Sequence, residues 1–254
     1  MQRLVLSDRP SACENETSAS NRVAPTRMSY DPRTIAFAAE ILYPPQQLRA
    51  DLVQSIHNTL YRQPATCYQN FQVAPDGIHL SNLPQAPGQI STASFAWDRL
   101  VLREELRGTT VEDFATRVVN VTMAAFQTLG VTATLAQQFV VRSLISPRHF
   151  RDGRGFLSQR LIAPGTEAWQ TFGRPLQSLG VRLVFPPNQG ARETYHVRIE
   201  TWPQDAQSLW VENTSSFAGP MPVADAPQLA NHLYATYRFL SGPVCDFLAT
   251  LDTP

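Results

Sequence analysis

The chain has 254 residues, enough to bury a substantial core in one large domain or two small ones. Its content of 43% hydrophobic and 17% charged residues is typical of a globular protein and too polar for an integral membrane protein. The 21 basic residues balance 21 acidic ones, which excludes a global field that would attract nucleic acid or an anionic membrane.

The basic residues counted above are all arginine. Arginine binds carboxylates and phosphates through paired hydrogen bonds, which would be a functional explanation; a GC-rich coding sequence explains the bias better. The cysteines Cys13, Cys67 and Cys245 lack metal-ligand spacing and the pattern of a disulfide framework, and Cys245 is expected to be a small buried hydrophobe. With no apolar run of about 20 residues and no signal-peptide h-region, the sequence predicts a cytoplasmic protein that does not enter the membrane.

Residues 1–27 are polar and carry no sustained helix or strand period, so this segment is expected to be disordered. Met28 stands just before the first strand pattern, and we interpret it as the true start of translation. Two units are then expected, an N-terminal α+β unit at 28–85 and a larger C-terminal α+β unit at 92–254, separated by a proline-rich link near 84–92.

In the first unit, residues 34–43 read as a strand ended by Pro44-Pro45, and 46–63 carry leucines at helical spacing. Two further strands flank Pro75-Asp76-Gly77, which has the composition of a hairpin turn.

In the second unit, residues 92–106 read as one alternating strand with Phe95, Trp97 and Val101 on one side. Thr110 and Asp113 then resemble a capping box at the start of a helix that ends at Gly130. A strand over 134–146 follows, then a helical insertion near 152–178.

Three closely spaced strands over 180–187, 193–202 and 208–217 indicate an antiparallel meander, and a final helix should break at Gly242-Pro243. The sequence of strand, helix and strand occurs twice. We therefore predict an α+β fold of antiparallel sheets with helices packed on one face, made of two similar ferredoxin-like halves.

The stretch SPRHFRDGRGFLSQR at 146–160 is the first candidate site, because arginines, glycines and aromatic rings together can bind phosphates and stack on bases. It lacks the spacing of known phosphate-binding loops. We favour a solvated connector and keep a single-stranded nucleic-acid surface as the alternative. Its candidate residues are Arg148, Phe150, Arg151, Arg154, Phe156 and Arg160.

The second candidate is one face of the late strands. Strand alternation places one set of polar and aromatic side chains on this face, opposite Tyr195, Val197 and Ile199. Such a face could dock a ligand, a peptide or unstacked bases, and an ordinary solvated face with cross-strand Arg–Glu pairs is the simpler interpretation. The residues of this set are Arg182, His196, Arg198, Glu200, Trp202 and Trp210, with Glu212 beside them.

No catalytic signature is found. The five histidines form no metal-binding group, no nucleophile elbow is present, and no metal or cofactor is expected. The neighbouring carboxylates Glu104 and Glu105 make a poor acid–base pair because adjacent strand side chains diverge.

The segments RTIAFAAEILYPP, GVRLVF, YHVRIETWPQDAQSLWVENTSSF and LANHLYATYRFL, taken in order, resemble a sporadically distributed bacterial protein family of unknown function. The resemblance extends over about residues 29–251 and rests on hydrophobic pattern and segment order. It implies an α+β protein, supplies no catalytic residue, and is compatible with mobile or defence-linked genes.

From these patterns we expect a non-enzymatic binding or assembly protein that recognises a protein partner. A nucleic-acid-binding subunit that uses the 148–160 stretch is the main alternative, and a small-molecule enzyme is a third. The sequence leaves open whether the chain forms a homo-oligomer.

Overall fold

The computed structural model describes residues 29–162, 166–190 and 192–254. The predictions for residues 1–27 and for Met28 lie outside the described residues. The strands are β1 (Arg33–Leu42), β2 (Asn70–Ala74), β3 (Gly77–Ser81), β4 (Ile90–Phe95), β5 (Arg99–Glu105), β6 (Ala133–Ile145), β7 (Gly180–Phe185), β8 (Thr194–Thr201) and β9 (Leu209–Pro222). The α-helices are α1 (Ala50–Tyr61), α2 (Val111–Leu129), α3 (Gly153–Phe156), α4 (Thr166–Gln170), α5 (Gln228–Phe239) and α6 (Cys245–Leu251).

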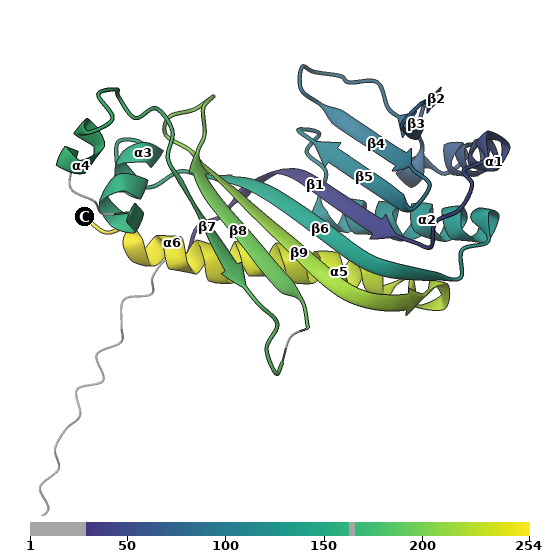
Figure 1. The fold of residues 1–254 in the computed structure, drawn as a ribbon. Coiled ribbons are helices and arrows are strands. Elements are labelled where there is room, and N and C mark those ends of the chain that lie inside the picture. Colours follow the sequence, from purple (N-terminus) through teal and green to yellow (C-terminus); the bar gives the residue numbers. More distant parts are fainter. Residues whose placement is uncertain (1–28, 163–165, 191) are drawn as a thin grey trace, which may run out of the picture.

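The nine strands form one antiparallel sheet in the order β2-β3-β4-β5-β1-β6-β9-β8-β7. The long helices α2 and α5 lie along one face of this sheet, and no helix of the described residues lies along the opposite face (Figure 1). The predicted α+β class, with antiparallel strands and helices on one face, is confirmed.

The helix α2 begins and ends where its sequence predicts. The Thr110 hydroxyl accepts a hydrogen bond from the backbone N–H of Asp113 at 3.1 Å, and Gly130 closes the helix in the left-handed region with φ of 70°. Phe114, Val118 and Phe126 are almost fully buried, as their helical spacing requires.

A single hydrophobic cluster lies between the sheet and the helices. Phe37 of β1 stacks on Phe114 of α2 with ring centroids 5.4 Å apart, and Tyr43 meets the edge of Phe126 at 5.7 Å. The cluster runs from α1 to α6, so both ends of the sheet share this core. Cys245 of α6 is fully buried within it, as predicted.

The order of connections is similar in the two halves of the sheet. From β1 the chain crosses to the outer strand β2 and returns through a meander to β5 beside β1; from β6 it crosses to β7 and returns to β9 beside β6. Each meander is followed by a long helix, α2 or α5. That these halves are ferredoxin-like stays a prediction.

The proline-rich link near 84–92 joins β3 to β4, which pair with each other in the sheet. The division of the chain into units at this link stays a prediction, and the sheet itself continues across it. The helical insertion expected near 152–178 contains α3, a π-helical segment at Leu157–Ile162, and α4.

The single strand expected over 92–106 is wrong, because this segment forms the hairpin of β4 and β5. Phe95 is fully buried, Val101 lies on the helix-free face, and Trp97 is 59% exposed in the turn between them. In the turn sequence Ala96-Trp97-Asp98, Asp98 is the one residue that favours a turn, and no glycine, proline or asparagine accompanies it, so the turn signal is weak.

The final helix breaks where Gly242-Pro243 predicts. A π-helical turn at Leu240–Val244 separates α5 from α6, because Pro243 cannot donate a backbone hydrogen bond. No helix in the described parts of the chain is long and apolar enough to cross a bilayer.

Candidate functional site

The Arg-rich stretch follows β6 and contacts the C-terminal segment. The buried carboxylate of Asp252 accepts hydrogen bonds from the backbone N–H groups of Arg148 and His149, at 2.6 and 3.0 Å, and from the Tyr30 hydroxyl. The Arg148 guanidinium lies 4.8 Å from the centre of the Tyr30 ring and donates to the Ser29 carbonyl at 2.9 Å. This part of the stretch therefore connects both ends of the described chain.

The aromatic rings of the stretch are used for packing. Phe156 is fully buried and meets Phe150 edge to face at 5.2 Å. Arg160 lies over the Phe150 ring at 5.2 Å and donates to the carbonyl of Thr253 at 2.9 Å. Arg151 is exposed. A buried Phe156 cannot stack on a base, which weakens the nucleic-acid interpretation of this stretch.

The late-strand residues lie on the helix-free face, which we call the open face. Across neighbouring strands, Arg182 of β7 is opposite Arg198 of β8, Arg198 is opposite Glu212 of β9, and Glu212 is opposite Arg142 of β6. Glu200 and Trp210 form the adjacent pair. His196 is opposite Thr214, one row away. Sequence alternation placed Arg182, His196, Arg198, Glu200 and Trp210 on one face, as the strand pairing does, whereas Trp202, predicted to share that face, lies beyond the end of β8.

Glu212 is the centre of the charged row. It is only 7% exposed, accepts a hydrogen bond from Arg142 Nε at 2.7 Å, and lies 3.6 Å from Arg198 Nη1. Both guanidinium groups lie over the Trp210 ring, at 5.9 Å for Arg142 and 5.0 Å for Arg198. The Trp210 indole therefore contacts two ion-paired arginines.

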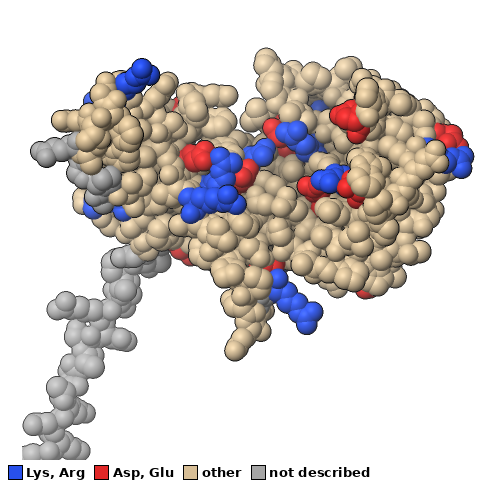
Figure 2. All heavy atoms as spheres, in the orientation of Figure 1, with Lys and Arg blue, Asp and Glu red and all other residues tan. Residues whose placement is uncertain are grey.

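The ion pairs continue towards the centre of the sheet. Glu105 of β5 accepts hydrogen bonds from Arg142 at 3.1 Å and from Arg103 at 2.6 Å, and Glu40 of β1 pairs with Arg99. On the face shown in Figure 2, basic side chains consequently lie against acidic ones across the middle of the described residues.

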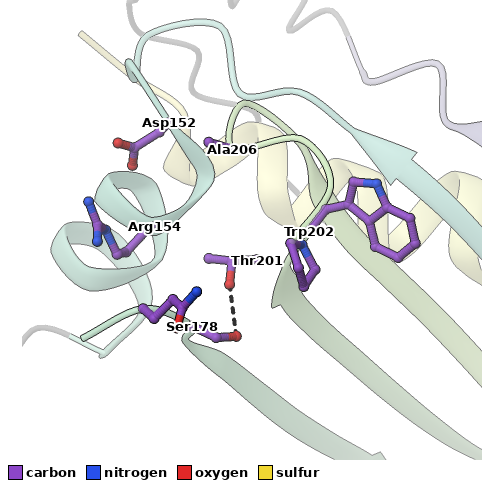
Figure 3. Close-up of a pocket in the computed structure, with 8 residues that line it drawn as sticks. Asp152, Arg154, Ser178, Thr201, Trp202 and Ala206 are labelled. Atoms are coloured by element: carbon purple, nitrogen blue, oxygen red, sulfur yellow. Dashed lines mark hydrogen bonds between the residues drawn. The ribbon is translucent and has the colours of Figure 1, made fainter. Parts of the chain in front are cut away.

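Arg154 and Trp202, one from each candidate stretch, line opposite sides of a pocket of about 290 Å³ at the end of β8 (Figure 3). Gly153 lets the start of α3 pack closely beside this pocket, because a Cβ there would lie 3.1 Å from the Ser208 carbonyl oxygen and 2.9 Å from Leu209. Arg154 itself donates to the Leu176 carbonyl at 2.9 Å. Trp202 lies beyond the last residue of β8, so it leaves the row of open-face residues and lines the pocket mouth.

Sequence reasoning missed a buried polar cluster on the helix side of the sheet. Glu104 is 3% exposed, accepts a hydrogen bond from the Ser91 hydroxyl at 2.7 Å, and forms an ion pair with Arg117 of α2. Arg107 lies 3.7 Å from its other oxygen. Burial raises the pKa of Glu104, although the arginines oppose that shift.

A pocket of about 320 Å³ opens beside Glu104, lined also by Asp113 and Thr116 of α2. The signal for this cluster was present in the sequence: Glu104 follows Leu100 and Leu102 at alternate positions, and these three share the buried face of β5. The neighbouring Glu105 points to the open face, so the two carboxylates diverge as the strand alternation predicts.

Within the described residues, no group of three or more histidine, cysteine or acidic side chains could hold a metal ion. Burial raises the pKa of the Cys245 thiol to about 12, so its sulfur is not an activated nucleophile. His232 is stacked on Phe217 at 3.9 Å, and burial lowers its pKa.

Comparison with protein-family models and with curated proteins finds no match for this chain. The family resemblance stays a prediction.

Proposed function

We propose that the protein is a binding or assembly protein whose open face recognises a partner protein. The observation that carries this proposal is the composition of that face: a wide sheet surface on which no described helix lies, where Trp210 contacts Arg142 and Arg198 and both arginines already have carboxylate partners. Tryptophan and arginine are the residues that most often dominate protein interfaces.

The charge pattern favours a protein over a nucleic acid. A polyphosphate chain that bound this row would have to approach Glu212, Glu105 and Glu40 as closely as it approached the arginines. A protein surface with both signs of charge can instead match the row side chain by side chain, which gives specificity and orientation. The face is therefore better suited to a folded partner of mixed charge.

An enzyme is the weaker proposal. The pocket of Figure 3 is lined by Arg154 of α3 and by Asp152, which caps this helix, but Asp152 already accepts a hydrogen bond from the backbone N–H of Gly155 at 2.6 Å. Ser178 and Thr201 bond each other at 3.0 Å in the same pocket. No general base lies beside either hydroxyl among the residues that line this pocket.

Capture of partners from a lysate of the native host, with and without nuclease, tests the proposal. We expect the tagged wild-type chain to retain a defined protein after nuclease treatment. The Trp210→Ala variant should bind the purified partner about 30-fold more weakly, the equivalent of about 2 kcal/mol for a hot-spot tryptophan.

The control variant is Met123→Glu, because Met123 is 36% exposed on α2 and lies away from the open face. It should bind like the wild type. A captured species that disappears with nuclease, or equal binding by both variants, would contradict the proposal.

A further inference from the structure

The strand β7 has an unpaired edge. It is the last strand in the sheet order, with β8 as its sole strand neighbour in the described residues. The backbone N–H of Thr201 donates to the Leu179 carbonyl at 2.9 Å. In an antiparallel pair, every second residue forms hydrogen bonds to the neighbouring strand, so this bond shows which residues of β7 bond to β8. Val181, Leu183 and Phe185 therefore bond towards β8, and the backbone groups of the residues between them point outward.

These outward groups belong to Gly180, Arg182 and Val184. Natural proteins usually protect such an edge with lysine, proline, a bulge or a covering element. The π-helical segment Leu157–Ile162 contacts β7, but no lysine, proline or register shift interrupts the strand, and Val184 is 51% and Phe185 40% exposed. These features are typical of an edge strand that pairs with a further strand.

An apolar groove of about 660 Å³ lies beside this edge. Leu183 and Phe185 line it on the strand side, and Phe239, Val244 and Phe247 line it on the side of α5 and α6. Phe239 supports the groove, because its ring lies 5.3 Å from Phe185 and is stacked at 4.0 Å on Tyr195. Phe247 is 40% exposed. If a further strand paired with β7, every second side chain of that strand would lie over these rings.

The open-face side of the same edge is basic. Arg182 donates to His196 Nδ1 at 3.1 Å and forms no ion pair with another described residue, whereas Arg198 on the next strand contacts both Glu200 and Glu212. An acidic side chain on an added strand would lie beside Arg182 and neutralise it. A second copy of this chain has no acidic residue in β7 to offer, and pairing centred on Arg182 would place two arginines opposite each other.

We propose that the edge of β7 binds an extended segment of the partner protein as a tenth strand. Apolar side chains at alternate positions occupy the groove at Phe185 and Phe247, and an acidic side chain between them pairs with Arg182. This mode of binding, strand addition, uses backbone hydrogen bonds for affinity and alternate side chains for specificity. The inference rests on the proposed function and names the part of the partner that this chain recognises.

Synthetic peptides test this inference without knowledge of the partner. The probe is a fluorescent peptide with the core Val-Glu-Phe-Glu-Val, compared by fluorescence anisotropy with a peptide in which lysine replaces both glutamates. We expect saturable binding of the acidic peptide to the full chain and at least about tenfold weaker binding of the basic one. The Arg182→Glu variant should reverse this order.

The variant Val184→Pro removes one outward N–H group and leaves the bonds between β7 and β8 in place. It should abolish binding of the acidic peptide. Val73→Pro, in the edge strand β2 at the other end of the sheet, is the matched control and should bind normally. Circular dichroism and the unfolding midpoint show whether each variant is folded; if Val184→Pro is not, the peptide with N-methylated backbone takes its place.

The inference would be overturned if both peptides bind equally or if neither binds. It would also be overturned if the acidic peptide still binds after both Val184→Pro and N-methylation. A concentration-dependent dimer that Val184→Pro abolishes would assign the edge to a second copy and would also overturn it. If neither peptide binds but Trp210→Ala still weakens binding of the partner protein, only the strand-addition mode is contradicted. If Trp210→Ala also leaves binding of the partner protein unchanged, the proposed function is contradicted as well.

Discussion

Asp252 is the residue on which the contact between the two ends of the described chain depends. Its buried carboxylate accepts hydrogen bonds from Tyr30, Arg148 and His149. Burial raises the pKa of Asp252, but these hydrogen bonds outweigh it and hold the pKa below its ordinary value. The carboxyl therefore releases its proton more readily in the folded state than in the unfolded chain.

Because the pKa of Asp252 is lower in the folded state than in the unfolded chain, its contribution to the free energy of unfolding is present above ~pH 4. This contribution is lost as the pH falls through the folded-state pKa. We expect Asp252→Asn to lower the free energy of unfolding by about 1–3 kcal/mol near neutral pH. Denaturant titrations at a series of pH values should show this difference shrinking in acid. A difference that stays constant with pH would show that Asp252 is not ionised in the folded state.

Glu104 and Glu105 are adjacent residues with opposite surroundings, which makes them a matched pair. Replacing Glu104 by alanine removes the ion-pair partner of Arg117 and the hydrogen-bond acceptor of Ser91 from a buried site, and we expect a loss of about 3 kcal/mol in the free energy of unfolding. Glu105→Ala on the open face should cost about 1 kcal/mol or less. Denaturant unfolding measures both, and equal losses would contradict the environments described for them.

At the scale of elements, the sequence predicted what local signals determine. The cap at Thr110, the left-handed Gly130 and the break at Pro243 depend on residue types within one turn, and all three are found. The hairpin of β4 and β5 was missed because the turn at Trp97 has no residue that requires a turn. The local pattern also could not predict which strands pair with each other, because strand pairing depends on contacts between residues far apart in the chain.

Gly130 and Gly242 should respond to alanine to different extents. Gly130→Ala forces a side chain into the left-handed region, and we expect it to lower the free energy of unfolding by about 1–2 kcal/mol. Gly242→Ala gains helix propensity and meets no residue apart from its chain neighbours, but Pro243 disfavours the helical region for a preceding residue with a Cβ, so we expect a change of less than about 1 kcal/mol. Thermal or denaturant unfolding of both variants distinguishes these outcomes.

At the scale of the molecule, alternation predicted which late-strand residues share a face, but it could not show that Arg142, Glu105 and Glu40 join them. Those residues come from strands β6, β5 and β1, which meet β8 and β9 only through the sheet order. The Glu104 cluster likewise needs α2 to supply Arg117. Sequence pattern therefore gave part of the open face and missed the charge pairing that defines it.

The balanced charges of the whole molecule predict a weak response to salt. We expect the affinity of the open face for its partner to change by less than about tenfold between ~50 and ~200 mM salt, because the ion pairs on this face are local. A surface that contacted six to ten phosphates would lose about 10³–10⁵ in affinity over that range. Isothermal titration with the purified partner at both salt concentrations measures the difference.

Photo-crosslinking from the open face tests the central claim most directly. A benzophenone amino acid in place of Thr214, at the centre of the late strands, should form a discrete nuclease-resistant protein adduct in native-host cells, and the same group in place of the exposed Met123 on α2 should not. A nuclease-sensitive adduct at Thr214, or an equal adduct at both positions, would contradict recognition of a partner protein by this face.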